Sequence, residues 1–180
     1  MIKRVLLAML LAAVPARAQT RSQWTLEQST LTYHVSHALN QVDGVSHAAQ
    51  GTGTCHDGEC DFLITVPVNT FDSANGHRDR HMLRVTHGEQ FPTITVRTRL
   101  PESATESERI HADLEIQFAG QIAEYKQVTF QQVTQGNETR ISGTIPTTLA
   151  DFKIDPPSLF TMAIRNEIPV RVDMTWKKEK

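Results

Sequence analysis

The sequence predicts an all-β protein, an extended antiparallel barrel of about eight strands with a short helical plug. Three observations support this prediction. Most of the chain alternates apolar and polar residues with a period of two, as half-buried strands do. Several of these segments run for about eight to ten residues, which favours a tall barrel. Helical signals are confined to one short segment around Arg80. The interior of such a barrel is either filled by side chains or holds one small ligand.

The first 18 residues have the pattern of a secretory signal peptide, which leaves residues 19–180 as one mature domain. Lys3 and Arg4 form its positive start, residues 5–14 its apolar core, and the Ala-Arg-Ala of residues 16–18 its cleavage site. The apolar core of about ten residues is too short to span a bilayer as a helix. We therefore expect an exported protein without stable membrane insertion.

Removal of that segment makes the protein mildly acidic. The formal net charge of the whole chain is −2, and the loss of Lys3, Arg4 and Arg17 lowers it to about −5. Binding of nucleic acid and docking on anionic lipid head groups both need a basic surface, so the charge argues against both kinds of partner.

Two segments near the start of the mature chain are expected to form strands, and the second of them is long. Strict alternation in residues 29–37 places Leu31, Tyr33 and Val35 on one face of that strand. The expected strands, in order, cover residues 24–26, 29–37, 61–68, 93–100, 109–118, 123–133, 139–146 and 167–176. Residues 51–54, which precede the two cysteines, contain two glycines that would permit a bulge.

Two cysteines, Cys55 and Cys60, flank the sequence His-Asp-Gly-Glu. Its Asp57-Gly58 pair is a strong hairpin-turn signal that would bring the cysteines face to face. In an exported chain this spacing predicts a disulfide, which would be a local staple because the loop is short.

A helical segment at residues 78–83 lies between two predicted strands and is expected to act as a plug on the barrel. Isolated helices below about 12 residues are marginal in water, so the segment must lie on something. Met82, Leu83 and Val85 give it an apolar side with which to do so.

The strands after the plug are the clearest in the chain. Residues 93–100 and 109–118 alternate throughout, and the polar, acidic segment 101–108 between them is expected to be a loop. Their apolar faces carry Ile94, Val96, Leu114, Ile116 and Phe118.

The following strand is expected to cover residues 123–133. Regular alternation would place Tyr125 and Gln127 on one face and Val128 and Phe130 on the other.

A series of short motifs runs along the centre of the chain in a fixed order, and the series comprises Phe71-Asp72-Ser73, Arg78-Asp79, His81-Met82-Leu83 and Phe91-Pro92-Thr93-Ile94. This order and spacing resemble the YceI-like family of periplasmic, lipocalin-like barrels. The resemblance extends from Trp24 to residues 149–159 and so covers nearly all of the mature chain. Residues 118–121 match the family pattern only loosely, which leaves the register of residues 118–133 open.

The resemblance implies a periplasmic protein that binds or carries an amphiphilic lipid, a polyisoprenoid or a similar long acyl chain, in the barrel interior. From the residues themselves, we expect Arg78 and Asp79 to cap and orient the plug through hydrogen bonds, with His81 joining them. Whether the protein forms a homodimer is left open by the sequence. The residues expected to contact the lipid are Leu31, Tyr33, Val35, Phe71, Met82, Phe91, Ile94, Val96, Leu114, Ile116, Phe118, Phe152, Phe160 and Met162.

Two other interpretations stay open. A filled barrel would be a structural or stress-response module without a ligand. A metal-dependent hydrolase would use His77 and His81, four residues apart on one side of a helix, together with a third ligand. However, Arg78 stands where a zinc-protease motif needs glutamate, and its charge repels a metal ion. We therefore predict no metal site, no cofactor and no enzyme, since no nucleophile elbow or phosphate-binding glycine loop is recognisable either.

Overall fold

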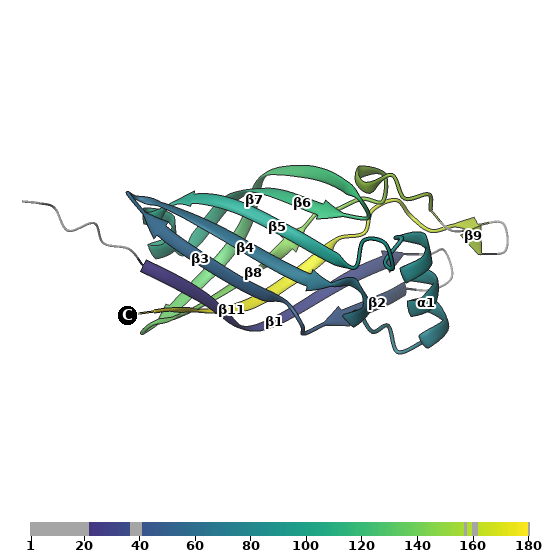
Figure 1. The fold of residues 1–180 in the computed structure, drawn as a ribbon, viewed down its shortest axis with the longest axis horizontal. Coiled ribbons are helices and arrows are strands. Elements are labelled where there is room, and N and C mark those ends of the chain that lie inside the picture. The colour runs from purple at the N-terminus through teal and green to yellow at the C-terminus, as the bar shows by residue number, and fades with distance from the viewer. Residues whose placement is uncertain (1–21, 37–40, 157, 160–161, 180) are drawn as a thin grey trace, which may run out of the picture.

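The protein is a long, twisted barrel with its strand ends gathered at two opposite ends (Figure 1). The computed structural model describes residues 22–36, 41–156, 158–159 and 162–179. The predicted signal peptide lies outside the described residues. None of the helices in these ranges is long and apolar enough to cross a membrane.

Nine strands build the main sheet: β1 (Ser22–Ser36), β2 (Gln41–Ser46), β3 (Gln50–His56), β4 (Glu59–Pro67), β5 (Thr93–Pro101), β6 (Arg109–Phe118), β7 (Gln121–Gln135), β8 (Glu138–Ile145) and β11 (Val170–Lys178). Strands β9 (Ser158–Leu159) and β10 (Met162–Ala163) form a separate short pair. The helices are η1 (Val68–Thr70), α1 (Gly76–Val85), η2 (Glu102–Glu106) and η3 (Ala150–Phe152).

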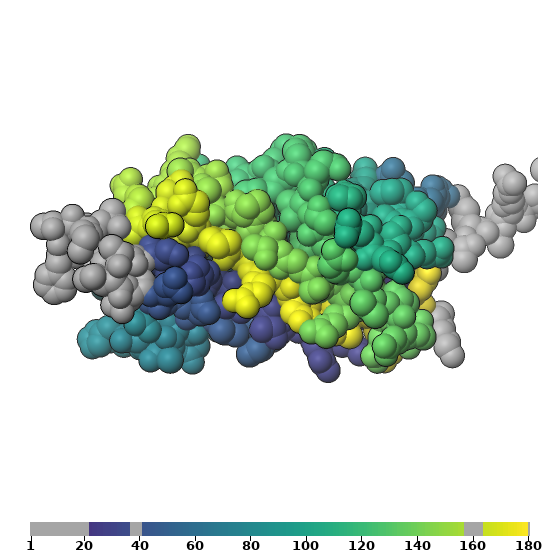
Figure 2. All heavy atoms as spheres, turned by 180° about the vertical axis from the view of Figure 1, so that it is seen from behind, coloured from purple at the N-terminus to yellow at the C-terminus, as the bar shows by residue number. Residues whose placement is uncertain are grey.

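The sheet closes on itself. Strands β3 to β8 follow one another in order, β8 pairs with β11, and β11 pairs back with β1 from Trp24↔Lys178 to Tyr33↔Val170. Strands β2 and β3 both pair with β1, at its two ends, and so share one position in the barrel, which reduces nine strands to eight positions. Figure 2 shows the closure from behind, with yellow β11 between the green strands and the purple start of β1. The predicted eight-stranded antiparallel barrel with one short α-helix is confirmed.

Strand β7 departs from regular alternation through a bulge. Its register with β6 shifts between Ala112 and Leu114, and Gln127 has a φ of 53°. The Asp113 carboxylate accepts hydrogen bonds from the backbone N–H of Gln127 (2.8 Å) and from its side chain (3.2 Å), and the backbone bond is the main cause of the lowered pKa of Asp113. Because the bulge reverses the phase, Tyr125 lies opposite inward-facing Leu114, and the prediction that it shares a face with Gln127 is wrong.

One further local prediction is corrected. The acidic segment expected to be a loop contains the 3₁₀-helix η2, which covers one end of the barrel. Thr105 of this helix is buried, and its carbonyl accepts a hydrogen bond of 2.6 Å from the buried side chain of Gln132.

The end of the barrel covered by η2 is closed by aromatic side chains, and we call it the closed end. The ring of Phe62 lies 6.3 Å from that of Trp24 and 5.3 Å from that of Trp176, measured between centroids. Gly53 permits this packing, because a Cβ there would stand 2.4 Å from the Phe62 ring. The predicted disulfide between Cys55 and Cys60 is present beside this cluster, at the β3–β4 hairpin, and both residues are fully buried.

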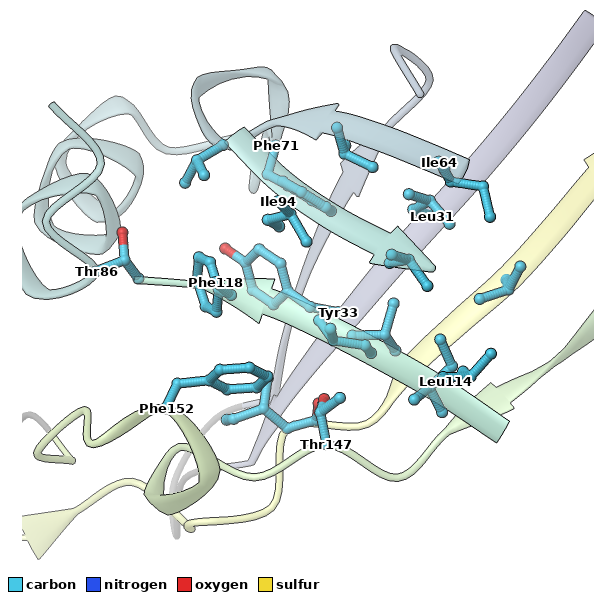
Figure 3. Close-up of a pocket in the computed structure, with 18 of the residues that line it drawn as sticks. Leu31, Tyr33, Ile64, Phe71, Thr86, Ile94, Leu114, Phe118, Thr147 and Phe152 are labelled. Carbon is cyan, nitrogen blue, oxygen red and sulfur yellow. The ribbon is translucent and has the colours of Figure 1, made fainter. Parts of the chain in front are cut away.

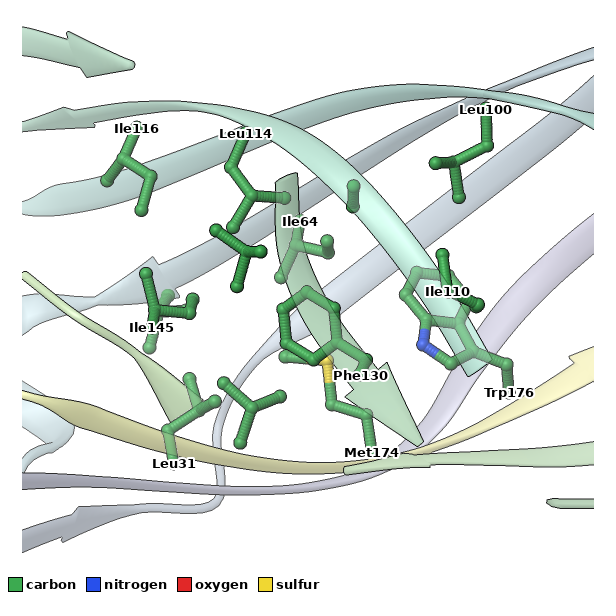
Figure 4. Close-up of a cluster of buried hydrophobic side chains, with 14 of the residues drawn as sticks. Leu31, Ile64, Leu100, Ile110, Leu114, Ile116, Phe130, Ile145, Met174 and Trp176 are labelled. Carbon is green, nitrogen blue, oxygen red and sulfur yellow. The ribbon is translucent and has the colours of Figure 1, made fainter. Parts of the chain in front are cut away.

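Buried aliphatic side chains continue from this end along the barrel interior. They come from separate strands and converge on the axis, as Leu31, Ile64, Leu114, Ile116 and Ile145 do in Figure 4. Alternation thus places one apolar row per strand inside, which is the pattern a closed barrel needs.

Candidate functional site

The barrel interior contains an elongated apolar cavity of about 760 Å³. It reaches from Trp176 and Phe62 at the closed end to helix α1 at the other end, which we call the open end. Aliphatic and aromatic side chains supply nearly all of its lining, with a few threonines between them. A volume of this size falls within the range of about 300–1,000 Å³ that is typical of ligand pockets.

Burial differs between the two ends of the cavity. Leu100, Ile110 and Trp176, near the closed end, are each exposed by 7% or less. The lining residues contributed by α1 are half-buried or exposed, except for Thr86 at its C-cap. The cavity therefore meets the surface beside α1.

Helix α1 forms where the sequence predicted the plug, and it is longer, spanning Gly76–Val85. Asn75 caps its start by accepting hydrogen bonds from the backbone N–H groups of His77 and Arg78. Thr86 ends it and donates its hydroxyl to the carbonyl of Met82 (2.9 Å).

A small polar network ties α1 to the segment before it. The Asp79 carboxylate accepts hydrogen bonds from the N–H (3.1 Å) and hydroxyl (2.6 Å) of Ser73. The Arg78 guanidinium donates to the hydroxyl (3.2 Å) and carbonyl (2.7 Å) of the same residue. Among the described residues no hydrogen bond from His81 joins this network; its side chain lies on the cavity lining and is exposed.

Tyr33 brings a hydroxyl into the open end. Its ring lies 5.6 Å from that of Phe71 and packs over Gly44, where a Cβ would stand 2.2 Å from the ring. Burial, followed by the charge of Asp79, raises the pKa of Tyr33, and the charge of Arg78 opposes that rise. The phenol therefore stays protonated near neutral pH and can donate a hydrogen bond into the cavity. Figure 3 shows Tyr33 and Phe71 directed into the same space as Phe118 and Phe152.

Helix η3 places Phe152 at the open end. The Phe152 ring meets that of Phe118 edge-on at 5.3 Å. Asp151 fixes the helix by accepting hydrogen bonds from the Tyr125 hydroxyl (2.6 Å) and from the N–H of Thr148 (3.0 Å). Burial raises the pKa of Asp151, but the bonds from Tyr125 and Thr148 outweigh it and hold that pKa below its ordinary value.

Sequence reasoning missed this arrangement of Tyr125 and Asp151. The spacing Thr148-x-x-Asp151 has the form of a capping box and could have located the start of η3. Nothing in the spacing indicated Tyr125, because its partner lies 26 residues away and the bulge in β7 sets its direction.

The structure places eleven of the fourteen residues expected to contact a lipid on the cavity lining. Phe91 is absent from that lining; its ring lies over Gly120, 2.6 Å from where a Cβ would stand. Phe160 lies outside the described residues, and Met162 is described only as backbone of β10. The eleven are Leu31, Tyr33, Val35, Phe71, Met82, Ile94, Val96, Leu114, Ile116, Phe118 and Phe152.

Further lining residues were not among those expected to contact a lipid, although alternation could have found most of them. They continue the inward faces of β7, β8 and β11 and include Phe130, Ile145, Val172, Met174 and Trp176.

The two histidines of α1 have surroundings that bear on the hydrolase interpretation. His77 and His81 both line the open end of the cavity, and the Arg80 guanidinium lies 3.1 Å from Nδ1 of His77. Within the described ranges, no group of three histidine, cysteine or acidic side chains is placed to hold a metal ion.

Comparisons with known proteins agree with this geometry. The family model described as "YceI-like domain" matches residues 23–176. A search of curated proteins finds no match.

Similar folds occur among solved structures. A polyisoprenoid binding domain from Saccharophagus degradans, implicated in plant cell wall breakdown, is similar with a TM-score of 0.70 and 12% identity, covering 87% of this chain and 98% of that one. Burkholderia cenocepacia BcnA has a TM-score of 0.69 and 10% identity, covering 82% of this chain and 95% of that one. The Campylobacter jejuni YCEI protein has a TM-score of 0.53 and 13% identity, covering 67% and 72%.

Proposed function

The chain belongs to the YceI-like family, and from this premise we propose that it binds or carries an amphiphilic lipid in the barrel, in the periplasm. The proposed ligand has a long apolar chain, a polyisoprenoid or a similar acyl chain. The observation that carries the proposal is the apolar cavity of about 760 Å³, which extends along the barrel and meets the surface at one end.

The energetics of burial favour such a ligand. Removing each methylene from water contributes about 0.8 kcal/mol, so one five-carbon isoprene unit contributes roughly 4 kcal/mol before ordering costs. Several units in one cavity would outweigh the loss of translational and conformational freedom, which is about 4–15 kcal/mol for association. The structured barrel lowers that loss because the site is preformed.

A binding role fits the lining better than the two alternatives. A filled structural barrel would have side chains in the space that the cavity occupies. A hydrolase would place reacting groups against the substrate, whereas the walls around the centre of this cavity are aliphatic, as at Ile64, Leu114 and Ile145. We therefore infer a carrier or binding protein.

Native mass spectrometry tests the proposal directly. The protein is expressed with its natural N-terminus, purified from a bacterial periplasm, and weighed before and after organic extraction. We expect a mature chain that starts at Gln19, with one extractable adduct of lipid mass. A chain without any adduct that also fails to take up added isoprenoid would overturn the proposal, and one bound metal ion per chain would favour the hydrolase.

A pair of variants on strand β6 locates the lipid. Ala112 lines the cavity and is 3% exposed, so Ala112→Phe puts a ring into the space that the chain would occupy. Gln117→Phe adds a ring to the exposed face of the same strand and is the matched control. We expect the first variant to lose the adduct or to retain a shorter one, and the second to keep it unchanged. An unchanged adduct in both would place the lipid outside the barrel.

A further inference from the structure

The acidic and basic residue types on the cavity lining that the structure describes are all of the basic kind, and all lie on one helix. They are His77, Arg78 and His81 of α1, and no aspartate or glutamate is on the lining formed by the described residues. From this distribution we propose that the ligand carries an anionic head group, a phosphate or a carboxylate, and that Arg78 with His77 and His81 holds it at the open end. The inference rests on the proposed function and names the chemistry of the ligand's polar end.

The spacing of these residues gives α1 two functions at the mouth. His77 and His81 are four residues apart and so lie on one side of the helix, with Arg78 beside them. Met82 and Val85 also line the cavity, which lets the same helix contact the apolar chain. The helix therefore presents basic and apolar side chains to one opening, as a site for an amphiphile requires.

The charge of α1 contrasts with that of the protein around it. The helix contains three arginines and one aspartate, a net charge of +2 with histidine neutral, whereas the mature chain carries about −5. Its single acid, Asp79, is engaged by Ser73. Asp72, the nearby acid of the preceding segment, accepts a hydrogen bond of 2.7 Å from the N–H of Ala74. Within the described ranges, none of the three arginines forms an ion pair.

Arg78 has donors left for a ligand. Its Nε and one terminal nitrogen contact Ser73, which fixes the plane of the guanidinium. The other terminal nitrogen makes no hydrogen bond within the described part of the chain, and the side chain is exposed at the cavity mouth. A guanidinium is permanently charged and matches the geometry of phosphate and carboxylate oxygens. Tyr33, whose hydroxyl is also at this end, can add a neutral donor.

A comparison of three ligands with the same isoprenoid chain tests the inference. The delipidated protein is titrated with the alcohol, its monophosphate and the carboxylic acid, at low and at high salt. We expect both acids to bind about tenfold or more tightly than the alcohol at low salt, which is the effect of one charge-assisted hydrogen bond. Raising the salt should reduce this preference and leave alcohol binding unchanged, because screening acts on charged pairs at an exposed mouth.

Two variants separate head-group recognition from folding. Arg78→Gln should abolish the preference for the acids and keep the affinity for the alcohol, whereas a purely structural arginine would lower both. Arg84→Gln removes a charge from the same helix away from the cavity lining and should keep the preference. If Arg78→Gln does not fold, the double variant His77→Asn and His81→Asn replaces it, with the same loss of preference expected.

The outcomes distinguish the two proposals. Equal binding of the alcohol and both acids would overturn the anionic head group and leave the lipid carrier standing. Binding of none of the three would overturn the lipid carrier itself. A preference for one acid over the other would support the inference and identify the head group as phosphate or carboxylate.

Discussion

The two ends of the barrel differ in the side chains and interactions that form them. At the closed end, Trp24, Phe62 and Trp176 pack against one another beside a disulfide, and helix η2 covers them. At the open end, α1 lies over the cavity with half-buried and exposed side chains and is attached through a polar network at Ser73. Packing of large aromatic side chains stabilises the closed end, whereas at the open end hydrogen bonds to the buried Ser73 position the half-buried and exposed helix α1.

This difference indicates how one small barrel can contain an internal cavity and still be stable. An internal cavity forfeits packing contacts along its walls, so other parts of the chain must stabilise the fold. The closed end provides a compact aromatic core, and the continuous strand ladder provides the backbone pairing. The open end can then expose basic and apolar groups to a ligand. We therefore expect substitutions at the closed end to change the free energy of unfolding and substitutions at the open end to change ligand binding.

The largest effect on stability is expected from Trp176→Ala at the closed end. Its side chain is 4% exposed and contacts Phe62, so its removal should lower the free energy of unfolding by about 3–5 kcal/mol. Met82→Ala at the open end is the comparison, and its cost should be clearly smaller because the side chain is half-buried. Urea denaturation of both variants without lipid measures the difference. Equal losses would mean that the two ends stabilise the fold alike.

Reduction of the disulfide should lower the free energy of unfolding by about 2 kcal/mol. This value follows from the chain-entropy estimate for a loop that closes over a separation of five residues. Urea denaturation with and without a reducing agent gives the change for the natural protein. The double variant Cys55→Ala and Cys60→Ala is the control, since a reducing agent should leave its midpoint unmoved. Lipid binding at the other end should persist in the reduced protein if it remains folded.

The sequence was sufficient to predict the barrel, because alternation is a local signal that a closed sheet preserves. Leu31, Tyr33 and Val35 share the inward face that their spacing predicts. The disulfide was equally accessible, since Asp57-Gly58 is a turn signal placed between two cysteines. In these regions local preference and tertiary structure agree.

The parts that sequence reasoning did not predict depend on contacts between distant segments. The bulge at Gln127 reverses the face of Tyr125, and its carboxylate partner Asp113 lies on another strand. Phe91 was expected to face the cavity, yet it packs over Gly120, a residue that follows a different strand. Periodicity within one strand carries no information about such partners.

Tyr125→Phe removes the hydroxyl that fixes η3. Its expected effect on stability is smaller than that of opening the disulfide. Loss of one hydrogen bond to a carboxylate should lower the free energy of unfolding by about 1 kcal/mol. Urea denaturation of both proteins across a range of pH measures it. The change should also loosen Phe152 and so weaken lipid binding more than its small effect on stability suggests.

The pH dependence of that difference has a definite sign. The pKa of Asp151 is lowered in the folded protein, so its contribution is present above the ordinary carboxyl pKa of about 4 and is lost as pH falls through the lower folded value. Burial, followed by the hydrogen bond to Asp151, raises the pKa of Tyr125, so its contribution is present below about pH 10 and is lost at still higher pH. The free energy of unfolding of the natural protein should therefore exceed that of Tyr125→Phe most between about pH 4 and about pH 10. A difference that does not vary with pH would contradict the hydrogen bond.

The smallest effect on stability is expected for His81→Ala. This variant tests whether His81 holds helix α1 in place or only lines the mouth of the cavity. The sequence assigned His81 to the network that holds the plug, and a residue in that role would cost about 1 kcal/mol or more when truncated. In the structure the side chain is exposed on the cavity mouth, and the contacts with Ser73 belong to Arg78 and Asp79. We therefore expect a change within about 0.5 kcal/mol in urea denaturation. Asp79→Asn is the matched comparison on the same helix, and it should cost more because it weakens the bonds to Ser73. If His81→Ala instead destabilises the protein as much as Asp79→Asn does, then His81 holds the helix in place and the open end depends on it for structure as well as for the ligand.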